Sequence, residues 1–245
     1  LKNSSGKAKI YRLDWTESQP LDVDLGTLDY RLIQEDGLTY VSLRSFVSST
    51  YDNMLARYAR EGAKARGSKA VIYDLRGNVG GSDSWPRKWI QSFLGTQNSI
   101  ETSMLYAQKN SALFAAENSE SLLPEDEGTC FAREVHGTWY ENDIPIIVLV
   151  DDHCGSSGEG AVQLLKTLDN VLVVGSNTAG YQLCGNISTF TLPYTGIGVR
   201  FGSTLFLYGD GENVDHRGYV PDVWCDPQDA LASVLALLKE QGVVS

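Results

Sequence analysis

The chain has 245 residues, of which 42% are hydrophobic and 21% charged, a composition that suits one large globular domain or two small ones. Its formal net charge is −11, and the few Lys and Arg residues form no cluster, which argues against a nucleic-acid partner. The sequence contains neither a run of 18 apolar residues nor a pair of cysteines at C-x-x-C spacing, so it predicts no integral membrane segment and no metal site.

The first 37 residues are polar and mixed. Two short alternating pieces, residues 8–13 and 28–33, suit edge strands or the tail of a preceding module. The chain starts without an initiator Met or the apolar core of a signal peptide, so we expect a mature or excised fragment. We therefore divide it into an N-terminal segment, residues 1–37, and a core domain, residues 38–245.

Strand and helix patterns alternate along the core domain. Residues 38–46 alternate apolar and polar side chains as a strand does, whereas residues 51–66 place apolar side chains at helical spacing. The same criteria predict further strands at 69–74, 100–107, 146–150, 171–174, 186–192, 198–201 and 204–208, and further helices at 85–93, 161–168 and 227–238. Residues 108–138 form a polar insertion between them. Strands joined by helices pair in parallel, so the predicted fold is α/β, with extra antiparallel strands after Gly185.

A glycine-rich loop, Leu75-Arg76-Gly77-Asn78-Val79-Gly80-Gly81-Ser82, follows the strand at 69–74. Glycine lets the backbone approach a ligand closely or adopt a positive φ, so a loop of this kind between strand and helix suggests an anion site. The loop matches neither a P-loop nor a dinucleotide fingerprint. At its start, Asp74 and Arg76 are expected to form a structural ion pair.

The five apolar residues 146–150 suit a strand buried on both faces, and Asp-Asp-His-Cys-Gly-Ser-Ser-Gly after them must form a tight turn into a helix. Ser156 in this turn would lie among unpaired backbone N–H groups at a helix N-terminus, where an acyl-transfer enzyme holds an oxyanion. Serine is also a common helix N-cap. Taken alone, the turn favours the N-cap interpretation.

Three motifs occur together and in order: VIYDLRGNVGG at 71–81, VLVDDHCGSSGEGAVQLL at 148–165 leading into VVGSNTAG at 173–180, and GYVPDV at 218–223. In order and spacing they resemble the tail-specific or C-terminal processing proteases, the serine peptidase family that includes the tricorn core protease and retinoid-binding repeats. The resemblance covers roughly residues 38–226. It implies a mixed-sheet spiral of ββα units similar to crotonase and Clp protease, a peptide or protein substrate, no cofactor, and a location outside the cytoplasm.

The resemblance places the family's nucleophile at Ser156, with Glu159 keeping the glutamate of the family's motif. It assigns the oxyanion hole to the backbone N–H groups of Gly80, Gly81 and Ser157. This assignment is physically consistent, because two loops at the same end of adjacent parallel strands can converge on one carbonyl group.

The chain departs from the family's pattern at the general base. Tyr181 stands where the processing-protease branch has a lysine, which excludes a Ser-Lys dyad at that position. The tricorn branch uses a histidine oriented by an acid six residues before the proline of the Gly-x-x-Pro-Asp motif. That acid corresponds to Asp215 here, with Glu212 as a near alternative.

The family's histidine comes from a region upstream of the glycine loop, where this chain has none. We therefore expect the base to lie outside this fragment, and His153, His216 and His136 remain as possible substitutes. The neighbouring Cys154 suggests a cysteine nucleophile with His153 as its base. We disfavour it because adjacent side chains diverge in an extended segment.

The sequence therefore predicts a serine endopeptidase core that acts through an acyl-enzyme on Ser156. A catalytically inactive ligand- or peptide-binding protein on the same fold is the alternative. An acyl-CoA enzyme of crotonase type is weaker, because no basic cluster awaits the CoA phosphates. The sequence leaves open the oligomeric state and whether the four cysteines are free or paired, with Cys154 and Cys184 as one candidate disulfide.

Overall fold

The fold comes from a computed structural model, which describes residues 30–110, 128–208 and 214–244. Its main sheet has six strands in the order β1-β2-β3-β6-β7-β10. Strands β2, β3, β6, β7 and β10 run parallel, and β1 joins β2 in an antiparallel hairpin. The bounds are β1 Arg31–Glu35, β2 Leu38–Ser42, β3 Ala70–Asp74, β6 Ile146–Val150, β7 Val171–Gly175 and β10 Val223–Trp224.

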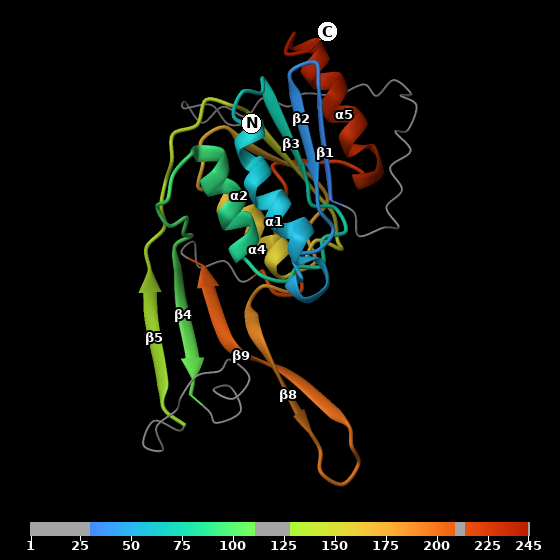
Figure 1. The fold of residues 1–245 in the computed structure, drawn as a ribbon. Coiled ribbons are helices and arrows are strands. Elements are labelled where there is room, and N and C mark those ends of the chain that lie inside the picture. Colours follow the sequence, from blue (N-terminus) through green and yellow to red (C-terminus); the bar gives the residue numbers. More distant parts are fainter. Residues whose placement is uncertain (1–29, 111–127, 209–213, 245) are drawn as a thin grey trace, which may run out of the picture.

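Helices cover both faces of this sheet (Figure 1). On one face lie α1 (Ser48–Ala65), α2 (Ser84–Leu94) and α4 (Ser157–Leu165), and on the other lies α5 (Pro227–Glu240). The larger core joins the first three helices to alternate residues of β3 and β6, and the smaller core joins α5 to the residues between them. Every residue of β3 and β6 is buried, as expected for strands with helices on both sides.

The sequence explains where the helices begin and end. The side chain of Asp226 accepts a hydrogen bond from Gln228 N, and Pro227 occupies the first turn, where its missing N–H is not needed. Helix α2 ends at Gly95, which adopts the left-handed conformation that glycine tolerates best. Trp89 is fully buried against Tyr58 and Tyr73 and belongs to the larger core.

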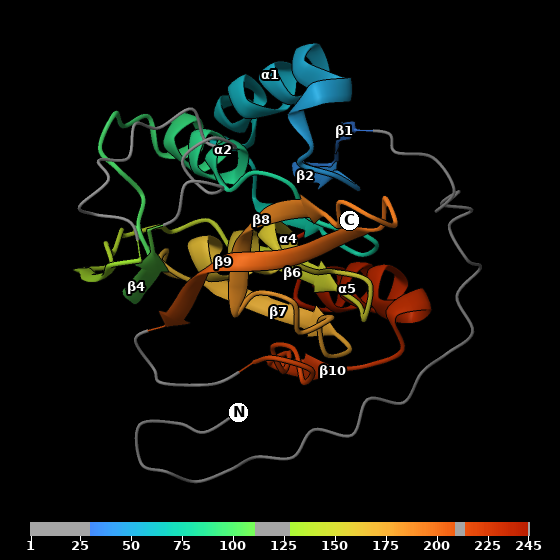
Figure 2. The same cartoon turned by 90° about the horizontal axis from the view of Figure 1, so that it is seen from below.

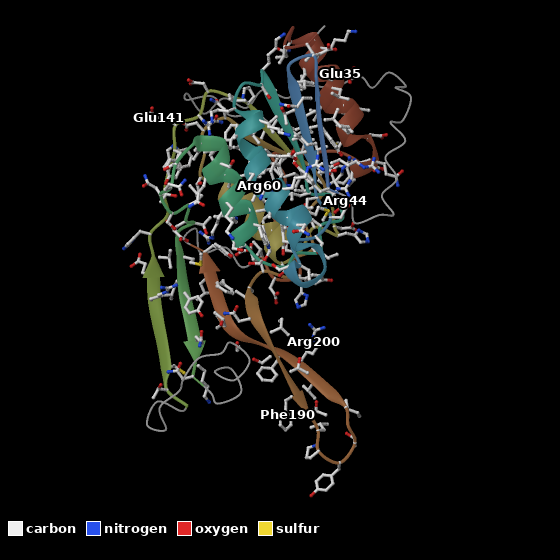
Figure 3. All side chains as sticks on the ribbon, in the orientation of Figure 1. Glu35, Arg44, Arg60, Glu141, Phe190 and Arg200 are labelled. Atoms are coloured by element: carbon white, nitrogen blue, oxygen red, sulfur yellow. The ribbon has the colours of Figure 1, made fainter. Side chains whose placement is uncertain are left out.

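A second, four-stranded antiparallel sheet, in the order β5-β4-β9-β8, projects from the helical body (Figure 1). Phe190 and Arg200 lie on its β8–β9 hairpin, which extends away from the main sheet (Figure 3). Seen from below, β8 and β9 run across the edge where β6 ends and α4 begins (Figure 2). The bounds are β4 Met104–Lys109, β5 Cys130–Val135, β8 Cys184–Thr191 and β9 Gly198–Tyr208.

The predicted α/β class and mixed sheet are confirmed, whereas the likeness to the crotonase and Clp protease spiral stays a prediction. Several details of the strand prediction were wrong, and the two-residue strand β10 was not predicted. The insertion at 108–138 contains β5, whose pairing with β4 supplies the order that its polar sequence does not signal. The strands predicted at 198–201 and 204–208 form the single strand β9, because Gly202 continues the ladder opposite Ile187.

The expected domain boundary after residue 37 falls in the turn of the β1–β2 hairpin, and the division into two parts stays a prediction. The possible edge strand at 8–13 lies outside the described residues. Within the described ranges, no helix combines the length and the apolar character needed to cross a membrane.

Candidate active site

Two loops meet at one edge of the main sheet. Strands β3 and β6 are parallel neighbours, so the glycine loop after β3 and the turn after β6 leave the sheet at the same end. Gly155 N donates a hydrogen bond to the carbonyl oxygen of Asn78 (2.9 Å), and Ser157 Oγ donates to the carbonyl oxygen of Gly81 (3.0 Å). The convergence of the two loops that the resemblance implied is therefore present.

Ser156 lies at the N-cap position of α4, as the simplest interpretation of the sequence predicted. Its backbone, however, has φ 52° and ψ −123°, a conformation that residues other than glycine rarely adopt. Holding such a conformation costs about 1–3 kcal/mol and is typical of functional sites. A sharp, strained turn between strand and helix also exposes the serine of nucleophile elbows, and Ser156 is exposed here.

Backbone N–H groups of both loops lie beside Ser156. Neither Gly81 N nor Ser157 N donates a hydrogen bond to any residue that the structure describes. Gly80 differs from the expectation, because its N–H donates to Asn78 Oδ1 (2.9 Å) and is already used. The geometry therefore leaves Gly81 and Ser157 as the donors available to an oxyanion, and Gly80 as the close-packed link between the two loops.

Asn78, which the sequence did not single out, holds these loops together. Its side chain is fully buried; Nδ2 donates to the carbonyl oxygen of Leu43 (2.7 Å), while Oδ1 accepts the Gly80 N–H. Its backbone oxygen accepts the hydrogen bond from Gly155 in the turn after β6. Asn78 thus connects the residue after β2, the glycine loop and the turn that carries Ser156.

Glu159 lies in the first turn of α4, where a carboxylate complements the helix dipole, and its side chain also joins two segments of the site. Its fully buried carboxylate accepts hydrogen bonds from Ser156 N (3.1 Å), Thr178 Oγ1 (2.6 Å), Gly180 N (2.8 Å) and Tyr181 N (2.8 Å). These four donors come from two segments. Glu159 therefore fixes the loop after β7 against the turn that carries Ser156.

The candidate acid Asp215 lies in a turn that packs on the same loop. His216 N donates to the carbonyl oxygen of Gly180 (3.0 Å), and Tyr219 N donates to Thr178 Oγ1 (2.7 Å). These contacts hold Asp215 at the same end of the sheet as Ser156. The loop after β7 lies between the Asp215 turn and Glu159 and bonds to both. The near alternative, Glu212, lies outside the described residues.

The three histidines are exposed, and none of them lines the cleft beside Ser156. His153 Nδ1 lies 2.7 Å from Asp152 Oδ1, and the side chain of His153 is 75% exposed. His216 Nε2 lies 3.5 Å from Asp215 Oδ2 and His136 Nδ1 lies 3.9 Å from Glu134 Oε1, both on the surface. In the part of the chain that the structure describes, no histidine hydrogen-bonds to Ser156.

Cys154 is buried and free, and burial raises the pKa of its thiol well above the usual value. A thiol with these properties is a poor nucleophile, which supports the preference for serine. Cys184 is also free, although it is exposed, so the candidate disulfide between them is not formed.

Asp74 forms the expected ion pair with Arg76 at the start of the glycine loop, with Asp74 Oδ2 2.6 Å from Arg76 Nη2. Arg44 Nη1 lies 3.3 Å from the other carboxylate oxygen. Burial alone raises the pKa of Asp74, but the hydrogen bond from Arg76 and the charges of both arginines outweigh it and lower that pKa. The network is structural: it anchors the loop whose glycines approach Ser156.

A cleft with a volume of about 290 Å³ opens beside Ser156. The glycine loop and Ser157 line one side, and the loop after β7 and the base of the second sheet line the other. Asp83, Gln182, Phe206 and Tyr208 contribute to it and were not predicted from the sequence. Asp83 directly follows the glycine loop, and this position was the one available signal. Phe206 and Tyr208 belong to β9, which lies more than 100 residues later in the sequence.

Several known proteins are similar to this chain. A family description, peptidase family S41, matches residues 37–224. The carboxy-terminal processing protease CtpA of Bacillus subtilis (strain 168) is 24% identical over 202 residues, which cover 82% of this chain and 37% of CtpA. This chain therefore spans less than half the length of that relative.

Two solved structures share the fold. The photosystem II D1 C-terminal processing protease has a TM-score of 0.50 at 20% identity, covering 78% of this chain and 43% of its own. A lipoprotein from Streptococcus agalactiae has a TM-score of 0.54 at 18% identity, covering 87% of this chain and 69% of its own.

Proposed function

The chain belongs to peptidase family S41, and we propose that it forms the catalytic core of a serine endopeptidase. The observation that carries this proposal is the exposed Ser156 in its strained turn, beside two backbone N–H groups with no partner among the described residues. A peptide-bond carbonyl placed there would meet a nucleophile and two oxyanion donors in one cleft. The substrates are peptides or proteins.

In the proposed mechanism, Ser156 Oγ attacks the carbonyl carbon of the scissile bond and gives its proton to a base. The N–H groups of Gly81 and Ser157 hold the oxyanion, and each such donor lowers the barrier by about 3–4 kcal/mol. The C–N bond then breaks as the base returns the proton to the leaving amine. Water hydrolyses the resulting acyl-enzyme by the same route.

The base in this proposal is a histidine outside these 245 residues, because the chain's own histidines lie away from the cleft. Asp215 orients that histidine by accepting a hydrogen bond from the imidazole N–H that faces away from Ser156, as the carboxylate of a serine triad does. The position of Asp215 supports this role, since its turn is tied to the loop that Glu159 fixes beside Ser156. Tyr181, also in that loop, lines the cleft and does not act as the base.

The activity is tested by digestion of β-casein with the full-length polypeptide in which these residues occur. We expect progressive cleavage, and its loss in Ser156→Ala. Ser233→Ala, on the surface of α5 with a local hydrogen bond to Asp229, is the matched control and should cleave at the wild-type rate. Undiminished cleavage by Ser156→Ala would rule out Ser156 as the nucleophile.

We propose that the protein acts outside the cytoplasm. The resemblance of the chain to the C-terminal processing proteases supports this location.

A further inference from the structure

The cleft beside Ser156 contains two buried oxygen atoms that accept no hydrogen bond from the described residues, Asp83 Oδ1 and Gln182 Oε1. Gln182 is 6% exposed, and although Asp83 keeps some exposed surface, its Oδ1 atom has none. Leaving a buried acceptor unpaired costs about 1–3 kcal/mol, more when it is charged. Two such acceptors in one cleft indicate a ligand that brings hydrogen-bond donors.

The charge of the residues that line the cleft indicates which kind of ligand would bind there. Asp83 is the single carboxylate among the lining residues, and none of them is Lys, Arg or His. Arg87, whose charge acts on Asp83, lies one turn along α2 and is already paired with Glu101 (2.6 Å) and the carbonyl oxygen of Ile100. The negative charge of Asp83 is therefore uncompensated within the cleft.

Aromatic rings form the rest of the wall. Tyr181, Phe206 and Tyr208 line the cleft together with Asp83. Aromatic faces attract cations through their quadrupole, and a carboxylate behind them adds a charge-assisted hydrogen bond. The cleft volume of about 290 Å³ is at the lower limit of small-molecule pockets, which suits one long side chain.

We propose that Asp83 determines substrate specificity by binding a positively charged side chain, Lys or Arg, of the residue whose carbonyl group is attacked. This inference rests on the proposed peptidase function. The carbonyl oxygen of that residue occupies the oxyanion hole formed by Gly81 and Ser157, so its side chain leaves from the same point. Asp83 lies two residues beyond Gly81, and its carboxyl packs beside Ser157 and Gly160.

The state of Asp83 agrees with this role. Burial raises the pKa of its carboxyl, and the nearby Ser157 hydroxyl and the charge of Arg87 offset only part of that effect. A cationic side chain would restore the favourable surroundings that the carboxylate has lost. A neutral side chain of the same shape would leave the charge uncompensated, so discrimination between the two should be strong.

The experiment measures binding, so that it does not depend on turnover. Two fluorescein-labelled peptides of the same sequence end in Arg or in citrulline, its neutral isostere, and are titrated into Ser156→Ala protein while anisotropy is recorded. We expect the Arg peptide to bind at least about tenfold more tightly, the worth of one charge-assisted hydrogen bond. Asp83→Asn, added to the same background, should bring the ratio close to one.

Asp229→Asn is the matched control, because it removes the same charge from an exposed position on α5 and should keep the ratio. Equal affinities for the two peptides, binding of neither, or a preference that survives Asp83→Asn would each overturn the proposal. Thermal melting verifies that the variants fold, and the comparison of the two peptides with Asp83 intact needs no such check. The peptidase proposal is tested separately, by the digestion of β-casein, so its failure would be distinguished from failure of the specificity proposal.

Discussion

Ser156 combines two properties that its sequence position alone does not distinguish. It is the N-cap of α4, as the pattern predicted, and it has a backbone conformation that serine disfavours. An N-cap needs only an extended backbone, so the cap role does not account for φ 52°. The strain is explained if the turn is shaped to expose the hydroxyl to the cleft.

Two variants of Ser156 separate the effect of backbone strain from the effect of losing the hydroxyl group. Ser156→Gly and Ser156→Ala both remove the hydroxyl, but only glycine adopts this conformation without penalty. We expect Ser156→Gly to be more stable than Ser156→Ala by about 1 kcal/mol in urea unfolding, after the greater chain entropy of glycine is subtracted. The opposite order of stability would show that the turn is not strained in solution.

Glu159 is the second residue whose role is defined by its contacts. Its carboxylate accepts four hydrogen bonds, so Glu159→Gln would direct an NH₂ group at N–H donors. We expect a loss of about 2–4 kcal/mol in the free energy of unfolding and loss of peptidase activity, because the loop after β7 is released.

The matched control is Glu141→Gln, whose side chain is on the surface (Figure 3) and whose substitution should change the free energy of unfolding by no more than about 0.5 kcal/mol. A Glu159→Gln variant as stable as this control would contradict the assigned role.

Because of Asp83, we expect the free energy of unfolding to depend on pH. Its folded-state pKa is raised above the unfolded value of about 3.9, so the folded state holds the proton more tightly. That contribution to stability is present below about pH 4 and is lost as the pH rises through the folded-state pKa. The charged and titratable groups facing it are Arg87, Glu101 and Tyr208.

Asp83→Asn stays neutral at every pH, so its stability relative to wild type should increase from pH 4 upward. Urea unfolding at several pH values measures this difference. A difference that does not change with pH would show that the carboxyl is not desolvated in the folded protein.

At the scale of elements, the glycine loop depends on close approach to the segment between β2 and α1. The loop passes so near to Phe46 that a Cβ atom at Gly81 would lie 2.1 Å from its carbonyl carbon, and φ at Gly81 is 141°. Gly81→Ala should therefore cost about 2–4 kcal/mol in the free energy of unfolding and displace one oxyanion donor.

Gly67→Ala is the control for this substitution. No atom lies within 4 Å of a Cβ placed at Gly67, and its φ is not in the left-handed region. Thermal melting and activity should both stay near wild type for this variant. If Gly81→Ala behaves in the same way, the loop is looser than its contacts indicate.

Elements with a strong local pattern were predictable from the sequence. The five apolar residues of β6 form a strand buried on both faces, and α5 follows the expected helical spacing behind its Asp-Pro cap. β5 was not predicted, because its polar residues Arg133 and Glu134 gain their order from pairing with β4 rather than from a buried face. Pairing with a distant strand produces no pattern in the sequence of the strand itself.

At the scale of the whole molecule, the site is an assembly of segments far apart in the sequence. Strand order brings together the loops after β3, β6 and β7. The resemblance implied this convergence for the first two of these loops. The second sheet then adds Phe206 and Tyr208 to the cleft. These residues could not be predicted, since nothing in the sequence of β9 states which edge of the main sheet it approaches.

The site residues likewise divide into those that the sequence motifs predicted and those that depend on the three-dimensional assembly. Ser156, Gly81 and Ser157 share one cleft, as their motifs indicated. The use of the Gly80 N–H by Asn78 depends on a side-chain rotamer, which no motif encodes. The unpartnered Asp83 depends on what surrounds it in three dimensions, so it became visible only in the structure.

The central claim is that Ser156 is an activated nucleophile whose base is a histidine beyond these residues. Intact-mass analysis after incubation with a fluorophosphonate tests it most directly, with the 245-residue chain, the full-length polypeptide and its Ser156→Ala variant treated in parallel. The account predicts one adduct on the full-length polypeptide and none on the variant or on the 245-residue chain. An adduct on the 245-residue chain would assign the base to one of its own histidines, and no adduct on the full-length polypeptide would contradict a serine peptidase.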